Sequence, residues 1–171
     1  MKQPQPGEYL PYYQKYIDMQ PADVPYAELL NRNTDEVLSL FGQIPEERHN
    51  YRYAPGKWTI KDVLMHVIDT ERAMSFRALV AARGDSDMQL YTLDEDRYAE
   101  NVDTTARSMD SLLEEFAAVR KATALLLNNV PEPQTLWSCN VAGNKVTVRA
   151  LAYIITGHVA HHLNVIRERY L

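Results

Sequence analysis

The stretch that decides the fold is TVRALAYIITGHVAHHLNVIRERY, residues 147–170. It contains three of the five histidines of the chain, His158, His161 and His162. At about 100° per residue, a helix over this stretch places His158 and His162 one turn apart on its apolar stripe. His161 projects toward the edge of that stripe, so we expect it to take no part in a shared site. The stripe consists of Leu151, Ile154, Ile155, His158, His162 and Val165.

A single histidine on a buried helix face is more often a core residue with a hydrogen-bond partner than a metal ligand. The pair at i and i+4 is different, because burying two neutral imidazoles costs desolvation free energy unless both rings find partners. One divalent cation would satisfy both rings, and catalytic zinc usually has three protein ligands and one open position. The pair therefore predicts a third ligand elsewhere in the chain.

The candidate third ligand is His66, in a helix predicted over residues 59–83 that begins with a good N-cap, Thr59. The helix face around His66 carries small and polar residues, which is typical of a cleft wall. Asp62 and Asp69 lie beside His66 on the helical wheel. They are either partners that orient the imidazole or a bound water, or solvated surface charges.

Two further long helices, predicted over residues 25–42 and 104–129, complete an all-α four-helix bundle. The acidic connection 84–103 is long for a bundle and could act as a lid over a cleft. It lacks the ligand order and central glycine of an EF-hand, which excludes that kind of calcium site. Before the last helix, WSCNV and KVTV flank a Gly143–Asn144 turn and predict a small β-hairpin.

We expect residues 1–171 to form one domain, with residues 1–24 as a tyrosine-rich arm that docks on the body or forms a short helix. His49 lies in a loop and is expected to face solvent.

The chain has a net charge of −5 and no basic block, which argues against a nucleic-acid partner. It shows neither a signal peptide nor an apolar run of membrane-spanning length. Its one cysteine, Cys139, excludes an internal disulfide and a cysteine-based zinc site, as is usual in a reducing cytosol. We therefore expect a cytoplasmic protein with a small-molecule partner.

Three segments carry a family resemblance. They are YRYAPGKWTIKDVLMHVIDTERAMSFRAL at 51–79, LDEDRYAENV at 93–102 and VTVRALAYIITGHVAHHLNVIRERY at 146–170. With these segments the chain resembles the DinB superfamily over nearly its whole length, and most closely the YfiT-like branch of metal-dependent hydrolases. The most specific element is the histidine that follows Trp-Thr-Ile, combined with HxxxH in the last helix.

This resemblance implies a four-helix bundle with long crossover connections and one divalent metal ion, commonly zinc or nickel, in a cleft at one end. Carried over residue by residue, the implied ligands are His66, His158 and His162, and His161 is not a ligand. Related proteins include low-molecular-weight-thiol S-transferases, and members of the family often form homodimers. A homodimer, and a thiol as substrate, are thus implied for this chain.

The predicted function is that of a metal-dependent enzyme, a hydrolase or a thiol transferase, with no catalytic side chain assigned. A non-catalytic metal-binding or sensory bundle, or a purely structural bundle, are the alternatives. Arg77 shares the His66 face and either binds an anionic substrate group or forms an ion pair within the bundle. Cys139 either reaches the cleft from the hairpin or packs in the core.

Overall fold

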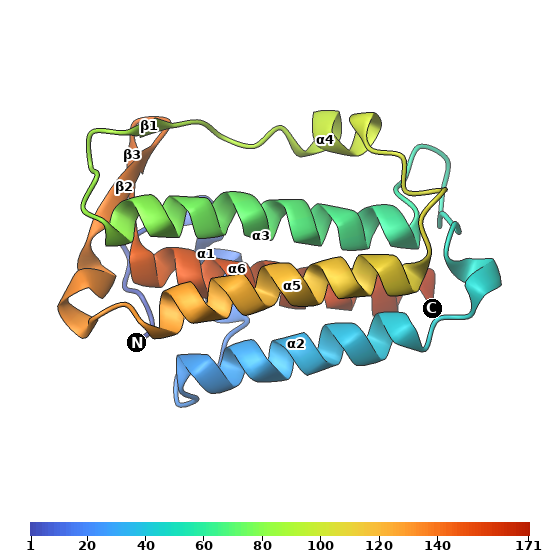
Figure 1. Cartoon of the computed structure of the whole chain (residues 1–171), viewed down its shortest axis with the longest axis horizontal. Helices are drawn as coiled ribbons and strands as arrows, with labels where there is room; N and C mark the ends of the chain where they lie inside the picture. The colour runs from blue at the N-terminus through green and yellow to red at the C-terminus, as the bar shows by residue number, and fades with distance from the viewer.

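Four long helices lie side by side in the computed structural model, which covers residues 1–171 (Figure 1). They are α2 (Tyr26–Gly42), α3 (Ile60–Ala82), α5 (Met109–Asn128) and α6 (Val148–Val165). The predicted four-helix bundle is therefore confirmed. None of the helices combines the length and the hydropathy needed to cross a bilayer.

Shorter helical segments connect and extend the bundle. They are η1 (Pro11–Tyr13), α1 (Gln14–Asp18), η2 (Glu46–Arg48), α4 (Glu95–Asn101), η3 (Glu132–Leu136) and the π-helical end of α6, η4 (Ile166–Tyr170).

The predicted hairpin is present as β2 (Ser138–Val141) and β3 (Asn144–Thr147), which pair antiparallel. The expected Gly143–Asn144 turn was misplaced by one residue. Ala142 and Gly143 occupy the turn, with φ of 49° and 85°, as the two central positions of a type I′ turn require. The Asn140 side chain accepts a hydrogen bond from the Gly143 N–H at 2.8 Å, which holds the turn in place.

The connection 84–103 has more structure than its sequence predicted. It contains β1 (Gln89–Leu90), which pairs in parallel with β2 and makes a sheet of order β1-β2-β3. It also contains α4, which begins where the Asp94 side chain accepts a hydrogen bond from the Arg97 N–H. The connection runs along α3 on the outside of the bundle (Figure 1), where a lid over α3 would lie.

Helix α3 begins as predicted, because Thr59 and Asp62 form a reciprocal capping box. The predicted start of the third long helix at Thr104 was wrong, since α5 begins at Met109 behind its N-cap Ser108. The Lys61 ammonium donates hydrogen bonds to the carbonyl oxygens of Thr105 and Arg107 at 3.1 and 3.0 Å. These bonds hold the segment before α5 and explain why the helix begins later than predicted.

The N-terminal arm lies against α6 at a very close approach. A Cβ added to Gly157 would lie 2.2 Å from the backbone oxygen of Tyr16. Only glycine therefore lets α1 reach this depth, one residue before His158. The contact sets the Tyr16 ring beside the histidines of α6.

The apolar core consists of two clusters, one near the sheet and the arm and the other near the α2–α3 connection. Between them lies a layer of buried polar residues. Arg120 forms an ion pair with Glu71, with a shortest N···O distance of 2.7 Å, and donates to Asn33 Oδ1 at 2.9 Å. The Asn33 amide in turn donates to the Thr156 carbonyl at 3.3 Å. All four long helices thus contribute to this polar layer.

Replacing Gly157 by alanine should destabilise the protein and displace the arm. We expect a loss of about 1–3 kcal/mol in the free energy of unfolding, as for other overpacked sites. Urea denaturation measures the loss, and limited proteolysis of the arm reports its release. Gly42→Ala is the matched control, because its Cβ would meet only Leu113 at 3.8 Å. Equal stability of the two variants would contradict the close approach.

Candidate metal centre

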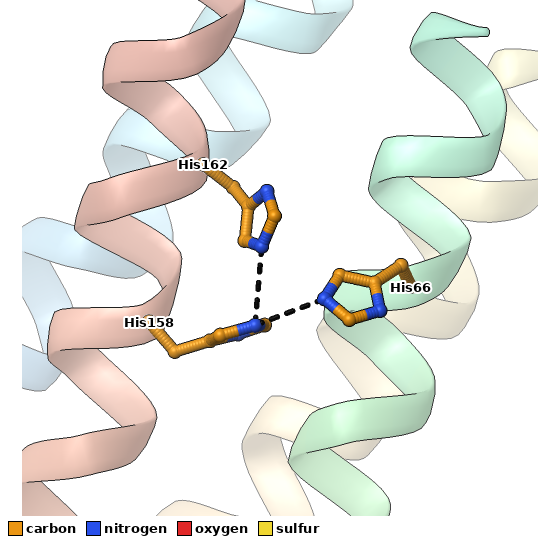
Figure 2. A group of neighbouring side chains, drawn as sticks. All are labelled: His66, His158 and His162. Atoms are coloured by element: carbon orange, nitrogen blue, oxygen red, sulfur yellow. Dashed lines mark hydrogen bonds between the residues drawn. The ribbon is translucent and has the colours of Figure 1, made fainter. Parts of the chain in front are cut away.

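Three imidazoles meet at one point between α3 and α6 (Figure 2). Helix α3 supplies His66, and α6 supplies His158 and His162 one turn apart. The Nε2 atom of His158 lies 3.0 Å from Nε2 of His66 and 3.1 Å from Nε2 of His162. One ring nitrogen from each residue lies within 4.8 Å of the other two. The structure thus brings together the three histidines that the sequence selected.

Hydrogen bonds among the three rings cannot satisfy this arrangement. Each Nε2 atom carries either one proton or one lone pair, but that of His158 faces two other nitrogens. At most one of its two contacts can be a well-directed hydrogen bond. A cation at the meeting point would accept a lone pair from all three nitrogens, so the donor set fits a divalent metal ion.

Burial keeps the three rings neutral, which is the state in which histidine binds a metal. It lowers the pKa of His66 to about 4 and that of His162 to about 2, with the other histidines adding to the effect. The pKa of His158, the most deeply buried of the three, falls well below its ordinary value for the same reasons. At neutral pH all three lone pairs are therefore available.

Two aromatic rings pack against the histidines. The Trp58 ring packs on His66 with centroids 4.7 Å apart, and the Tyr16 ring packs edge-on against His158 at 5.6 Å. The buried Nδ1 atom of His162 has no hydrogen-bond partner in the chain. Packing, more than hydrogen bonding to outer groups, orients these rings.

Two hollows open on the histidine cluster. The first has a volume of about 410 Å³ and reaches His158 between the N-terminal arm, α3, α6 and the start of α4. The second, of about 220 Å³, reaches His162 beside Trp58. The resemblance implied a cleft at one end of the bundle. His66 lies in the N-terminal third of α3 and the other two histidines in the C-terminal half of α6, toward the end of the bundle where the Tyr170 hydroxyl donates to the Trp58 carbonyl. The arm and the connection 84–103 line the larger hollow, so the connection lies where a lid would.

The two remaining histidines contribute no nitrogen to the convergent group, although the His161 ring centroid lies 5.0 Å from that of His162. His161 is half-buried and packs against Tyr16 with ring centroids 5.8 Å apart, and it is not in the convergent group. His49 was expected to face solvent, but it is half-buried. Its Nε2 atom lies 2.9 Å from the carbonyl oxygen of Ile44, which explains a histidine at that loop position without a metal.

Neither aspartate beside His66 on the helical wheel bonds to it. Asp62 caps α3 and accepts a hydrogen bond from the Thr104 hydroxyl at 2.6 Å. Asp69 pairs with Arg72 at 3.4 Å. Of the alternatives open from the sequence, orientation of the His66 imidazole by these carboxylates is therefore wrong. The Thr59-x-x-Asp62 spacing is itself a capping-box signature and already indicated the role of Asp62.

Arg77 lines the cavity beside the histidines, whereas Cys139 does not. Arg77 is buried and lines the larger cavity, where it donates to the Tyr91 carbonyl at 2.6 Å and forms no ion pair. The ion pair considered for it is therefore absent. Cys139 is buried in β2, where its thiol contacts the Val146 carbonyl oxygen at 3.8 Å. It belongs to the core and lines neither hollow.

Sequence reasoning did not assign three residues that complete the surroundings of the histidines. Trp58 directly precedes the predicted helix 59–83 and Tyr16 lies in the N-terminal arm, and neither motif nor spacing indicates a contact made by docking. Thr70 lies one turn after His66 on the predicted face, and its buried hydroxyl has no partner. Its wheel position was the one available signal.

Comparisons with known proteins agree with this architecture. The structure is similar to YfiT from Bacillus subtilis, with a TM-score of 0.74 and 15% sequence identity over 87% of this chain and 90% of the other. YfiT is described as a probable metal-dependent hydrolase with an unusual four-helix bundle topology. The structure is also similar to a DinB-like protein from the same organism, YjoA. That match has a TM-score of 0.57 and 18% identity over 84% of this chain and 90% of the other.

No curated protein matches the sequence significantly. The family model of the DinB superfamily matches residues 29–166, a range that includes most of α2, the other three long helices and all three converging histidines. The chain therefore belongs to the DinB superfamily.

Proposed function

We propose that the protein is a metal-dependent enzyme that acts on a small molecule, with His66, His158 and His162 holding one divalent ion. The reaction is either a hydrolysis or a transfer reaction that uses a low-molecular-weight thiol. The observation that carries the proposal is the convergence of three neutral Nε2 atoms, 3.0 and 3.1 Å apart, at the wall of a cavity. The description of YfiT, which shares the fold, as a probable metal-dependent hydrolase supports it.

The other side chains of the site orient the histidine rings and exclude bulk water from them. Trp58 and Tyr16 restrict the rings of His66 and His158 to orientations in which both Nε2 atoms face the same point. The arm and the start of α4 shield the His158 side of the cluster from bulk solvent. When bound, a divalent cation supplies Lewis acidity that lowers the pKa of a water or a thiol beside it.

The ligand count favours catalysis over a structural role. Structural zinc sites usually have four protein ligands and often use cysteine, whereas catalytic sites keep a position open. The convergent group has three histidines and no carboxylate or thiol, and Cys139 is buried in β2. Zinc and nickel both accept imidazole ligands, and either ion is part of the proposal. A homodimer and a cytoplasmic location remain predictions.

Alanine substitution of any one of the three histidines should remove most of the metal. Outer groups that only orient a ligand already cost about 10–100-fold in affinity, so we expect the loss of a ligand to cost at least about 100-fold. Plasma mass spectrometry of the purified variants gives the metal content per chain. His161→Ala and His49→Ala are the controls and should retain the wild-type content. A loss from His161→Ala equal to that from His158→Ala would reject the ligand assignment.

Chelation should abolish activity and leave the helices in place. Two apolar clusters stabilise the bundle, and their burial does not depend on the ion. Circular dichroism before and after chelation gives the helical content, and a screen of hydrolytic and thiol-transfer reactions gives the activity. Helicity that collapses with metal loss would instead show a structural site.

A further inference from the structure

We infer that the larger cavity binds a small molecule with one carboxylate, which Arg77 receives while the opposite end of the ligand faces the histidines. The inference concerns Arg77 and the cavity. It rests on the proposed function only for what happens at the histidine end.

Arg77 is a buried cation without a counter-ion. Arg77 is 5% exposed, and no carboxylate of the chain forms an ion pair with it. Its guanidinium contacts the Tyr91 carbonyl at 2.6 Å and the weak acceptor Sδ of Met74 at 3.3 Å, and the Tyr13 hydroxyl lies within its hydrogen-bonding reach. A buried charge is costly unless it is paired. A guanidinium has five N–H donors in a planar fork that matches a carboxylate, so donors remain for a ligand.

Thr70 gives a second, independent indication of a ligand. It is 6% exposed and lines the same cavity. Its Oγ1 atom is buried and has no hydrogen-bond partner. Buried hydroxyls almost always have partners, so this one indicates a polar group in the cavity, between Arg77 and the histidines.

The order of these groups along α3 gives the shape of the ligand. At about 1.5 Å per residue, the backbone of Thr70 lies about 6 Å and that of Arg77 about 16 Å beyond His66 along the helix axis. The Arg77 side chain leans back toward the N-terminus of α3, as helical side chains do. The ligand is therefore elongated, with its carboxylate at one end and its reacting group at the other.

The walls and rim of the cavity restrict the ligand further. The walls are mostly apolar or aromatic and include Leu10, Tyr12, Tyr13, Tyr16, Met74 and Ile154. Asp94 and Glu95 are exposed at the rim, where they would repel a second negative charge. The combination favours a monocarboxylate with an apolar or amide-containing body over a phosphate ester or a polyanion.

The test uses N-hexanoylglycine and its uncharged analogue N-hexanoylglycinamide, titrated calorimetrically into the full-length protein with and without its metal. We expect N-hexanoylglycine to bind at least about tenfold more tightly than the amide, as a charge-assisted hydrogen bond implies. Arg77→Met should remove that preference, and Arg77→Lys should retain part of it. Thr70→Val should weaken binding of the carboxylate about fivefold. Arg83→Met, at an exposed arginine at the end of α3, is the matched control and should bind as wild type.

Equal binding of the acid and the amide by the wild-type protein would overturn the inference, even if an Arg77 variant failed to fold. So would a preference that Arg77→Met retains, or one that disappears on chelation, because the carboxylate would then bind the metal. The metal content of the Arg77 variants should equal that of wild type. Failure of carboxylate binding is thus distinguishable from failure of the metal assignment, which depends on the histidine variants.

Discussion

The convergence of three neutral imidazoles between α3 and α6 is the constraint on which the rest of the site depends. Nitrogens 3.0 and 3.1 Å apart cannot all be paired by the protons of neutral rings, so the cluster is costly without a cation. The residues next to the histidines on the two helices, among them Val67 and Val159, belong to one of the apolar clusters of the core. Folding energy and chemistry thus come from different side chains of the same two helices.

Secondary structure and the His158–His162 pair were predictable because both depend on local spacing. His66, 92 positions before His158, was selected by its place on a polar helix face and by the family resemblance. The HxxxH stripe, the Thr59 cap and the turn residues before α6 act within a few positions of the sequence. What could not be predicted depends on docking. Nothing near Tyr16 indicates that Gly157 opens a path to its backbone, and nothing in the acidic connection indicates that Leu90 pairs with Val141 in a third strand.

The same distinction explains the corrected assignments. Asp62 has the wheel position of an orienting partner, but the N-terminal N–H groups of α3 need an acceptor and claim its carboxylate. Arg77 shares the His66 face on the wheel, where an ion pair within the bundle was one of two alternatives, but the connection packs against it and provides only a carbonyl. A helical wheel gives direction, whereas the elements that dock on a helix decide the partners.

X-ray absorption spectroscopy of the metal-loaded protein tests the central claim most directly. For zinc, the account predicts three imidazole nitrogens at about 2.0–2.1 Å, with the scattering pattern of histidine rings and no sulfur ligand. His66→Ala should reduce the imidazole count of any metal that remains. A shell of oxygen ligands alone, or one that includes a sulfur atom, would contradict the assignment of His66, His158 and His162 as the metal site.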